Sequence, residues 1–144
     1  MIWKIIAIGD PALDYAREGI RAYLFRLKGF GKIETVFLKP GPDVFRRVLD
    51  KSDGHFRVVL DERGRQFSTR QFASEIQKWE NRSISRCALL VGGADGWDDV
   101  VRARADLLWA LGSLTLQHEL ALLVALEQLY RSATIKAGMP YHRD

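Results

Sequence analysis

An apolar run that stops in a cluster of glycines constrains this chain more than any other feature. Leu89, Leu90 and Val91 are followed by three glycines within the five positions 92–96. A short apolar run bounded by glycine is typical of a buried strand, so we expect a strand that ends in a turn which side chains would obstruct. In an open α/β sheet, turns at the carboxyl ends of strands bind ligands. A tight turn without a ligand fits the same residues.

Segments with strand character alternate along the chain with segments of helical period. The expected strands are 2–8, 33–38, 56–60, 87–91 and 107–116, the last running into a loop. The expected helices are 12–27, a short one around 44–49, one that starts after Ser68, 98–104 and 118–136. In a chain of 144 residues, this alternation predicts a single domain, 1–144, with an α/β, Rossmann-like fold. Its sheet would be mostly parallel, with helices on both faces.

Polar residues mark the expected ends of several elements. Asp10 and Pro11 suit the N-cap and the first position of helix 12–27, and Ser68 begins a capping-box pattern. Residues 61–64 are expected to form the polar turn that ends strand 56–60. Helix 118–136 is apolar over more than one face, which predicts the core on one side and a partner subunit on the other.

The composition excludes several classes of protein. No stretch approaches the roughly 20 consecutive apolar residues of a membrane-spanning helix. The first nine residues are too short for a secretory leader, so a cytoplasmic protein is expected. Cys87 is the single cysteine, which excludes an intrachain disulfide and a multi-cysteine zinc site and favours a buried structural thiol. The net charge of +4 allows a polyanionic partner without requiring one.

The common catalytic and phosphate-binding motifs are absent. The glycine loop matches neither G-x-G-x-x-G nor G-x-x-x-x-G-K-[ST], and no serine lies in G-x-S-x-G. His55, His118 and His142 have no metal-ligand spacing, so no metal is expected. Two loops remain as ligand candidates, residues 92–96 and 111–118, and both would emerge at the same edge of a parallel sheet. Their backbone groups would suit a neutral ligand.

The end of the chain concentrates functional side chains. Tyr141, His142 and Arg143 follow Pro140 directly. An aromatic ring, an imidazole and a guanidinium can provide stacking, proton transfer and phosphate contact, which is the combination that RNA recognition uses. A frayed basic tail is the alternative interpretation.

Four sequence blocks in order carry a resemblance to a known family. They are Leu-Val-Gly-Gly-Ala-Asp-Gly at 90–96, Ala-Leu-Gly-Ser-Leu-Thr-Leu-Gln-His at 110–118, Glu-Gln-Leu-Tyr-Arg-Ser at 127–132 and Pro-Tyr-His-Arg at 140–143. The chain resembles, over its whole length, the ribosomal RNA large subunit methyltransferase H family of small SPOUT-class enzymes. This resemblance implies a homodimer whose carboxyl-terminal part forms a trefoil knot, an exception to the rule that chains do not thread themselves.

The resemblance also implies an activity and a site. The family transfers the methyl group of S-adenosyl-L-methionine to N3 of a pseudouridine in 23S ribosomal RNA, on assembled ribosomes. The cofactor-binding residues implied by the motifs are Leu60, Gly92, Gly93, Leu111, Gly112, Ser113, Leu114, Thr115 and Leu116. His142 is the first candidate for the proton acceptor, because an imidazole titrates near neutrality. Tyr141 and Arg143 would position the base and a phosphate across the dimer.

The chain departs from the family pattern around one histidine. Gln117 and Glu119 stand where the family has prolines on either side of His118, and Leu122 or a neighbour stands where the family has an arginine. Loss of that arginine removes an RNA or dimer contact, and Glu119 would bring a negative charge near the RNA. These departures affect the expected RNA binding more than the expected cofactor binding.

Two other functions are compatible with parts of the sequence. One is a degenerate SPOUT-fold dimer that binds RNA or the ribosome without methylating it. The other is an unrelated small α/β oxidoreductase or regulator, which would need a phosphate-bearing cofactor. The missing phosphate fingerprint counts against that last possibility.

Overall fold

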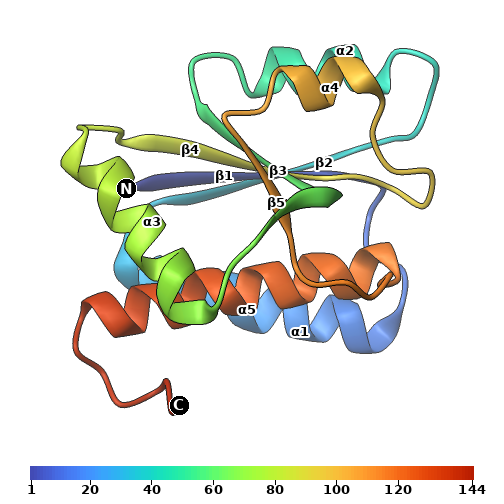
Figure 1. Ribbon diagram of the computed structural model, residues 1–144. Helices are drawn as coiled ribbons and strands as arrows, with labels where there is room; N and C mark the ends of the chain where they lie inside the picture. Colours follow the sequence, from blue (N-terminus) through green and yellow to red (C-terminus); the bar gives the residue numbers. More distant parts are fainter.

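The computed structural model describes residues 1–144, which form one five-stranded sheet with helices on both of its faces (Figure 1). The strands are β1 (Ile2–Ile8), β2 (Ile33–Leu38), β3 (Phe56–Gln66), β4 (Arg86–Val91) and β5 (Leu107–Ala110). The helices are α1 (Asp14–Leu27), the 3₁₀ turn η1 (Lys28–Phe30), α2 (Val44–Lys51), α3 (Thr69–Asn81), α4 (Asp99–Ala103) and α5 (His118–Lys136).

All neighbouring strands of the sheet are parallel, in the order β2-β1-β4-β3-β5. The buried strand predicted from Leu89 and its neighbours pairs with β1 on one side and with β3 on the other. Because the strands are parallel, the segments that follow β3, β4 and β5 leave the sheet at the same edge. The predicted α/β fold is confirmed. The trefoil knot is consistent with this strand order and stays a prediction.

Alternate residues of the central strands supply two separate cores. On one face, Ile5 and Leu89 pack beneath α1, α3 and α5. On the other face, Ile6 and Leu90 pack beneath α2 and α4. These side chains are fully buried or nearly so. Central parallel strands that are covered on both faces are continuously apolar, which explains why the strand run in the sequence does not alternate.

Helix α5 is buried on two sides within the chain itself. It packs between α1 and α3, beneath the sheet (Figure 1). At Gly19, a Cβ atom would lie 2.7 Å from the Leu123 side chain, so the missing side chain allows α1 and α5 to approach closely. The wide apolar surface of α5 is therefore explained inside one subunit, and its expected contact with a partner stays a prediction.

Strand β3 is longer than the sequence predicts. The polar turn expected at residues 61–64 is wrong, because the strand continues to Gln66. Arg65 and Gln66 pair with Trp109 and Ala110 of β5 after a shift in register. A Cβ atom at Gly64 would lie 2.5 Å from the Leu108 carbonyl carbon, so two backbones pass each other closely there. The polar residues 61–64 predict a turn, but the pairing of Arg65 and Gln66 with β5 keeps the chain extended there.

The predicted start of the first helix is also wrong. Helix α1 begins at Asp14 with Leu13 as its N-cap, and Asp10 does not cap it. Its cap comes instead from the opposite end of the sequence: Glu119 Oε1 accepts hydrogen bonds from the backbone N–H groups of Ala12 at 2.7 Å and Leu13 at 3.0 Å. Glu119 is only 9% exposed. Its carboxylate thus stabilises a helix terminus, and the expectation that it would face the RNA is corrected.

Other local predictions are confirmed. Ser68 and Gln71 form the reciprocal capping box at the start of α3. Cys87 is completely buried, and burial raises the pKa of its thiol to about 12, which suits a structural thiol. Leu122 is 3% exposed and belongs to the core. None of the helices combines the length and the apolar character that crossing a bilayer would need.

Replacing Glu119 by alanine is expected to lower the free energy of unfolding by about 2 kcal/mol, because two backbone N–H groups lose a charged acceptor. Urea unfolding followed by circular dichroism measures the change in midpoint. Glu62→Ala, which removes an exposed carboxylate, is the matched control and should change stability by no more than about 0.5 kcal/mol. Equal effects of the two substitutions would contradict the capping role.

Candidate functional site

A cavity of about 470 Å³ lies between the middle of β3 and the carboxyl ends of β4 and β5. It is formed by the segment after Leu60, the glycine loop 92–96 and the loop 111–117, together with the first turns of α5. Its lining residues are Leu60–Arg63, Val91–Trp97, Arg102, Trp109, Leu111, Gly112, Leu114–His118 and Ala121. The two loops that the sequence selects as ligand candidates therefore face one common space.

The glycine loop approaches its neighbours too closely for side chains. A Cβ atom at Gly92 would lie 3.3 Å from the Trp97 ring and 3.4 Å from the Gly96 backbone. Gly96 has a φ of +71°, in the left-handed region that favours glycine. Glycine is thus needed at position 92 because neighbouring atoms approach closely, and at position 96 because of the backbone conformation.

Trp97 and Arg102 tie the glycine loop to the middle of β3. The Trp97 indole Nε1–H donates to the Leu60 carbonyl oxygen at 3.1 Å, and the ring is 4% exposed. The Arg102 guanidinium donates to Asp61 Oδ2 at 2.9 Å and also to the Trp97 carbonyl oxygen. The hydrogen bond to Asp61 raises the pKa of Arg102. Two walls of the cavity are therefore fixed relative to each other before any ligand binds.

Most of the predicted cofactor-binding residues lie together at this cavity. Its lining includes Leu60, Gly92, Gly93, Leu111, Gly112, Leu114, Thr115 and Leu116. Ser113 is the exception, because it is exposed and does not line the cavity. Its hydroxyl lies 3.4 Å from Gln66 Nε2 on β3.

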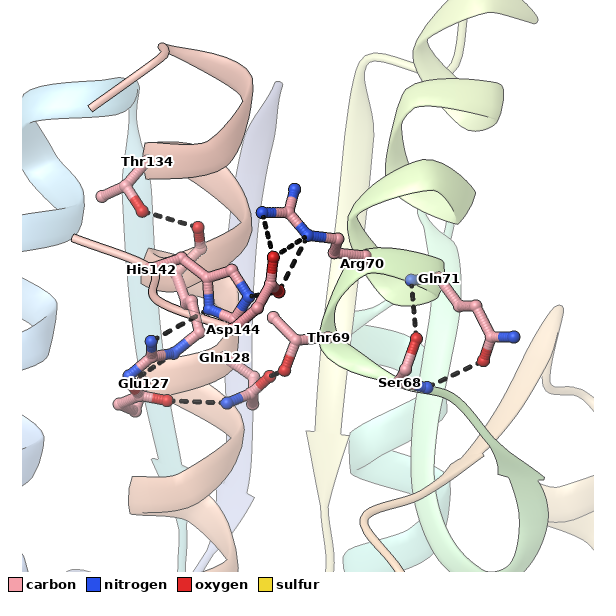
Figure 2. Close-up of polar contacts among 10 residues, drawn as sticks. Ser68, Thr69, Arg70, Gln71, Glu127, Gln128, Thr134, His142 and Asp144 are labelled. Atoms are coloured by element: carbon pink, nitrogen blue, oxygen red, sulfur yellow. Dashed lines mark hydrogen bonds and ion pairs between the residues drawn. The ribbon is translucent and has the colours of Figure 1, made fainter. Parts of the chain in front are cut away.

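The carboxyl-terminal tail is held on the surface of α5 and α3, as Figure 2 shows for His142 and Asp144. Asp144 accepts hydrogen bonds from Arg70 Nε at 3.0 and 3.1 Å and from Arg70 Nη2 at 2.9 Å. These contacts, with that from His142, lower the pKa of Asp144. Arg143 is exposed and makes no hydrogen bond or ion pair in the chain. The tail is thus ordered by its neighbours and leaves one guanidinium free.

Both ring nitrogens of His142 have partners. Its Nδ1 lies 3.1 Å from Arg131 Nη1, which can only donate, so Nδ1 is the acceptor. Its Nε2 is then the protonated nitrogen and donates to Asp144 Oδ1 at 2.9 Å. In this arrangement His142 has no free lone pair, and it can accept a proton only after its contact with Arg131 opens.

Tyr141 is also engaged within the chain. Its hydroxyl lies 3.1 Å from the hydroxyl of Tyr23 and donates to Glu127 Oε1 at 3.2 Å. Burial, together with these two neighbours, raises the pKa of Tyr141. Tyr141 is therefore a neutral phenol at physiological pH.

The structure does not bring the predicted catalytic residues to the cavity within one chain. His142 contacts Arg131, which lies thirteen residues after His118 on α5. Ala121 is the last residue of α5 that lines the cavity, so at about 1.5 Å per residue Arg131 lies about 15 Å farther along the helix. The tail of one chain and the cavity of the same chain are thus separate.

Several residues at the cavity escape prediction from the sequence. Trp97 and Arg102 lie in a segment whose only signal in the sequence is the acidic residues at the start of the expected helix 98–104. Their partners on β3 are distant in sequence. His118 lines the cavity and is half-buried. Its position within the loop 111–118 is a signal that identifies it as a candidate cavity residue. The spacing of the three histidines excludes a metal site.

Comparison with known proteins places this geometry in a family. The family model described as "Predicted SPOUT methyltransferase" matches residues 1–142. A ribosomal RNA large subunit methyltransferase H from Thermus thermophilus is 47% identical over 140 residues, which cover 97% of each chain. A protein of the same name from Deinococcus radiodurans is 40% identical over 141 residues, covering 96% of this chain and 97% of that protein.

A solved structure shares the fold. A probable methyltransferase from Bordetella pertussis superposes with a TM-score of 0.61, covering 91% of this chain and 95% of that chain. Its sequence identity is 13%, so this similarity supports the fold alone.

Trp97→Phe keeps an aromatic ring at the cavity but removes the donor to the Leu60 carbonyl oxygen. We expect a loss of about 1 kcal/mol in the free energy of unfolding and faster amide hydrogen exchange in residues 92–97. Mass-spectrometric hydrogen exchange measures the second effect. Trp79→Phe, at a buried tryptophan far from the cavity, is the control. Unchanged exchange in the Trp97 variant would show that the indole does not hold the loop.

Proposed function

The chain belongs to the SPOUT methyltransferase family and, within it, to the ribosomal RNA large subunit methyltransferase H proteins, and from this premise we propose that it methylates large-subunit ribosomal RNA. The proposed methyl donor is S-adenosyl-L-methionine. The proposed acceptor is N3 of a pseudouridine in 23S ribosomal RNA within the assembled ribosome. The observation that carries the proposal is the single cavity that the glycine loop and the loop 111–117 form together.

The cavity suits a nucleoside-containing sulfonium cofactor. Its volume of about 470 Å³ lies within the range typical of small-molecule sites. Gly112 carries no side chain, and no atom lies within 4 Å of the point where one would begin, so a ligand can reach its backbone amide and carbonyl groups. Leu60 and Leu116 provide apolar wall surface for an adenine ring. The residues of both loops thus offer the backbone contacts and apolar walls that such a ligand requires.

The charges around the cavity also fit this cofactor. Among the charged residues at its lining, Asp61 and Arg102 pair with each other. The exposed Glu62 and Asp95 outnumber the exposed Arg63, and this excess of negative charge favours a positively charged sulfonium. A phosphate-bearing cofactor would meet the same negative charges and no glycine phosphate motif. The charge pattern therefore favours a sulfonium cofactor over a dinucleotide.

We propose further that the active form is a homodimer. Tyr141, His142 and Arg143 do not line the cavity of their own chain, so a second copy would bring a tail to each cavity. Tyr15 and Phe25 on α1 are 53% and 75% exposed, and Leu114 in the second loop is 79% exposed. A partner that covers these apolar side chains would gain stability from their burial.

In the proposed reaction the protein mainly positions two reactants. When bound, the cofactor supplies a methyl group that is already activated by its sulfonium. The cavity loops orient that group, and the anchored Trp97 keeps this part of the cavity lining fixed. Arg143 is free to contact a phosphate, while Tyr141 remains neutral and can pack against the base. Alignment of this kind accounts for a large share of the rate of a transfer reaction.

Mass mapping of ribosomal RNA tests substrate and activity together. In cells that lack this protein, the methyl group on a large-subunit pseudouridine should be absent, and adding the protein back should restore it. Calorimetry should detect binding of S-adenosyl-L-methionine to the isolated protein. Ribosome binding without methylation and without cofactor binding would instead identify a degenerate RNA-binding dimer.

Deletion of residues 140–144 is expected to abolish methyl transfer while leaving the affinity for S-adenosyl-L-methionine almost unchanged, since the tail lies outside the cavity of its own chain. Single-turnover methylation and calorimetry measure the two effects separately. Arg70→Ala, which removes the partner of Asp144 and keeps the whole tail, is the comparison variant. Equal loss of activity and of cofactor affinity in the deletion would show that the tail is only structural.

A further inference from the structure

His118 lines the cavity with its ring tautomer fixed by the chain, and we propose that it acts as a neutral hydrogen-bond donor to the base that is methylated. The inference rests on the proposed function and assigns to that reaction a catalytic residue other than those of the tail. It is carried by the contacts of Gln117 and His118 at the start of α5.

The orientation of the Gln117 side-chain amide is settled by the helix. Gln117 is the N-cap of α5, and its Oε1 accepts hydrogen bonds from the backbone N–H groups of Glu119 at 2.9 Å and Leu120 at 3.0 Å. Both partners can only donate, so the atom that meets them must be the amide oxygen. The amide nitrogen therefore points the other way, toward His118.

This orientation determines the tautomer of His118. Gln117 Nε2 lies 3.2 Å from His118 Nδ1, and an amide nitrogen can only donate. Nδ1 must then carry a lone pair, and in the neutral ring the proton lies on Nε2. No other side chain or backbone group makes a hydrogen bond with the imidazole ring of His118. Its Nε2–H group is thus an unused donor on a residue that lines the cavity.

The contact with Gln117 itself requires the uncharged ring, because Nδ1 can accept from the Gln117 amide only while it carries a lone pair. His118 is the first residue of α5. A neutral imidazole at a helix N-terminus can act as an electrophile that stabilises a negative oxygen.

The reaction proposed above generates such an oxygen. Loss of the N3 proton from a uracil-type ring leaves a negative charge that is shared with the two carbonyl oxygens next to N3. The Nε2–H of His118 donates to one of them and stabilises this anion. The N3 proton passes to solvent water, and the N3 electron pair bonds to the methyl carbon. The methyl–sulfur bond breaks at the same time, and its electrons return to the sulfonium sulfur to give a neutral thioether.

His118 neither gains nor loses a proton in this scheme. It therefore differs from the general base that the sequence suggests for His142, whose nitrogens are both occupied by Arg131 and Asp144. The role is that of an oxyanion donor, whose removal typically lowers kcat by about 100- to 1000-fold.

Nitrogen NMR of the ring tests the tautomer without any cofactor. The full-length protein with ¹⁵N-labelled histidine should show the Nε2–H tautomer for His118. Gln117→Glu keeps oxygen acceptors for the α5 cap but replaces the donor that meets Nδ1 by an acceptor. This variant should convert His118 to the Nδ1–H tautomer. An imidazolium or an Nδ1–H ring in the unaltered protein would overturn the proposal.

Kinetics test the role in catalysis. His118→Leu should lower the single-turnover rate about 100-fold or more, while His118→Gln, whose amide N–H can reach a similar point, should retain at least about a tenth of it. Gln117→Glu should lower the rate as His118→Leu does. His118→Leu and His118→Gln should bind S-adenosyl-L-methionine within about threefold of each other, because the donor that distinguishes them acts on the base. His55→Gln, in an exposed turn before β3, is the control.

The outcomes separate the two proposals. Inactivity of the unaltered protein toward ribosomal RNA would overturn the proposed function, and the NMR result would still decide the tautomer. Equal inactivity of His118→Gln and His118→Leu would show that proton acceptance, and not donation, is needed, which would overturn the donor role. Full activity of His118→Leu would overturn it as well.

Discussion

One buried carboxylate joins the first and last helices of this protein. Glu119, in the first turn of α5, caps the backbone N–H groups that precede α1. In many α/β folds the N-terminus of the first helix binds a phosphate of the ligand. Here a side chain of the same chain occupies that position. The space left for a ligand therefore lies farther along the edge, between the middle of β3 and the ends of β4 and β5.

The cavity is organised by groups that are fixed before a ligand arrives. Trp97 and Arg102 hold the middle of β3 against the glycine loop, and Gln117 fixes both the start of α5 and the ring of His118. Each of these side chains makes hydrogen bonds with backbone groups or with another side chain of the protein. A site of this kind does not have to reorganise its dipoles when charge develops in it.

Local patterns in the sequence predicted most elements, and long-range contacts explain the failures. The apolar run at Leu89 and the capping box at Ser68 are signals contained within a few residues, and both are confirmed. The continuation of β3 beyond Asp61 depends on pairing with β5, and the cap of α1 depends on Glu119, more than a hundred residues away. The two candidate ligand loops could be predicted because both follow apolar runs, and they line one cavity. The tautomer of His118 could not be predicted, because it depends on the orientation of the Gln117 amide.

The close passage of β3 over β5 has a consequence for synthesis of the protein. Arg65 and Gln66 have β5 as their strand partner, and β5 begins only at Leu107. While the chain emerges from the ribosome, the second half of β3 thus remains an unpaired edge until about forty more residues have been made. The charged sequence Asp61-Glu62-Arg63 in this half resists pairing with other chains during that interval. The polar residues that resemble a turn are thus of the charged type that unpaired strand edges commonly carry.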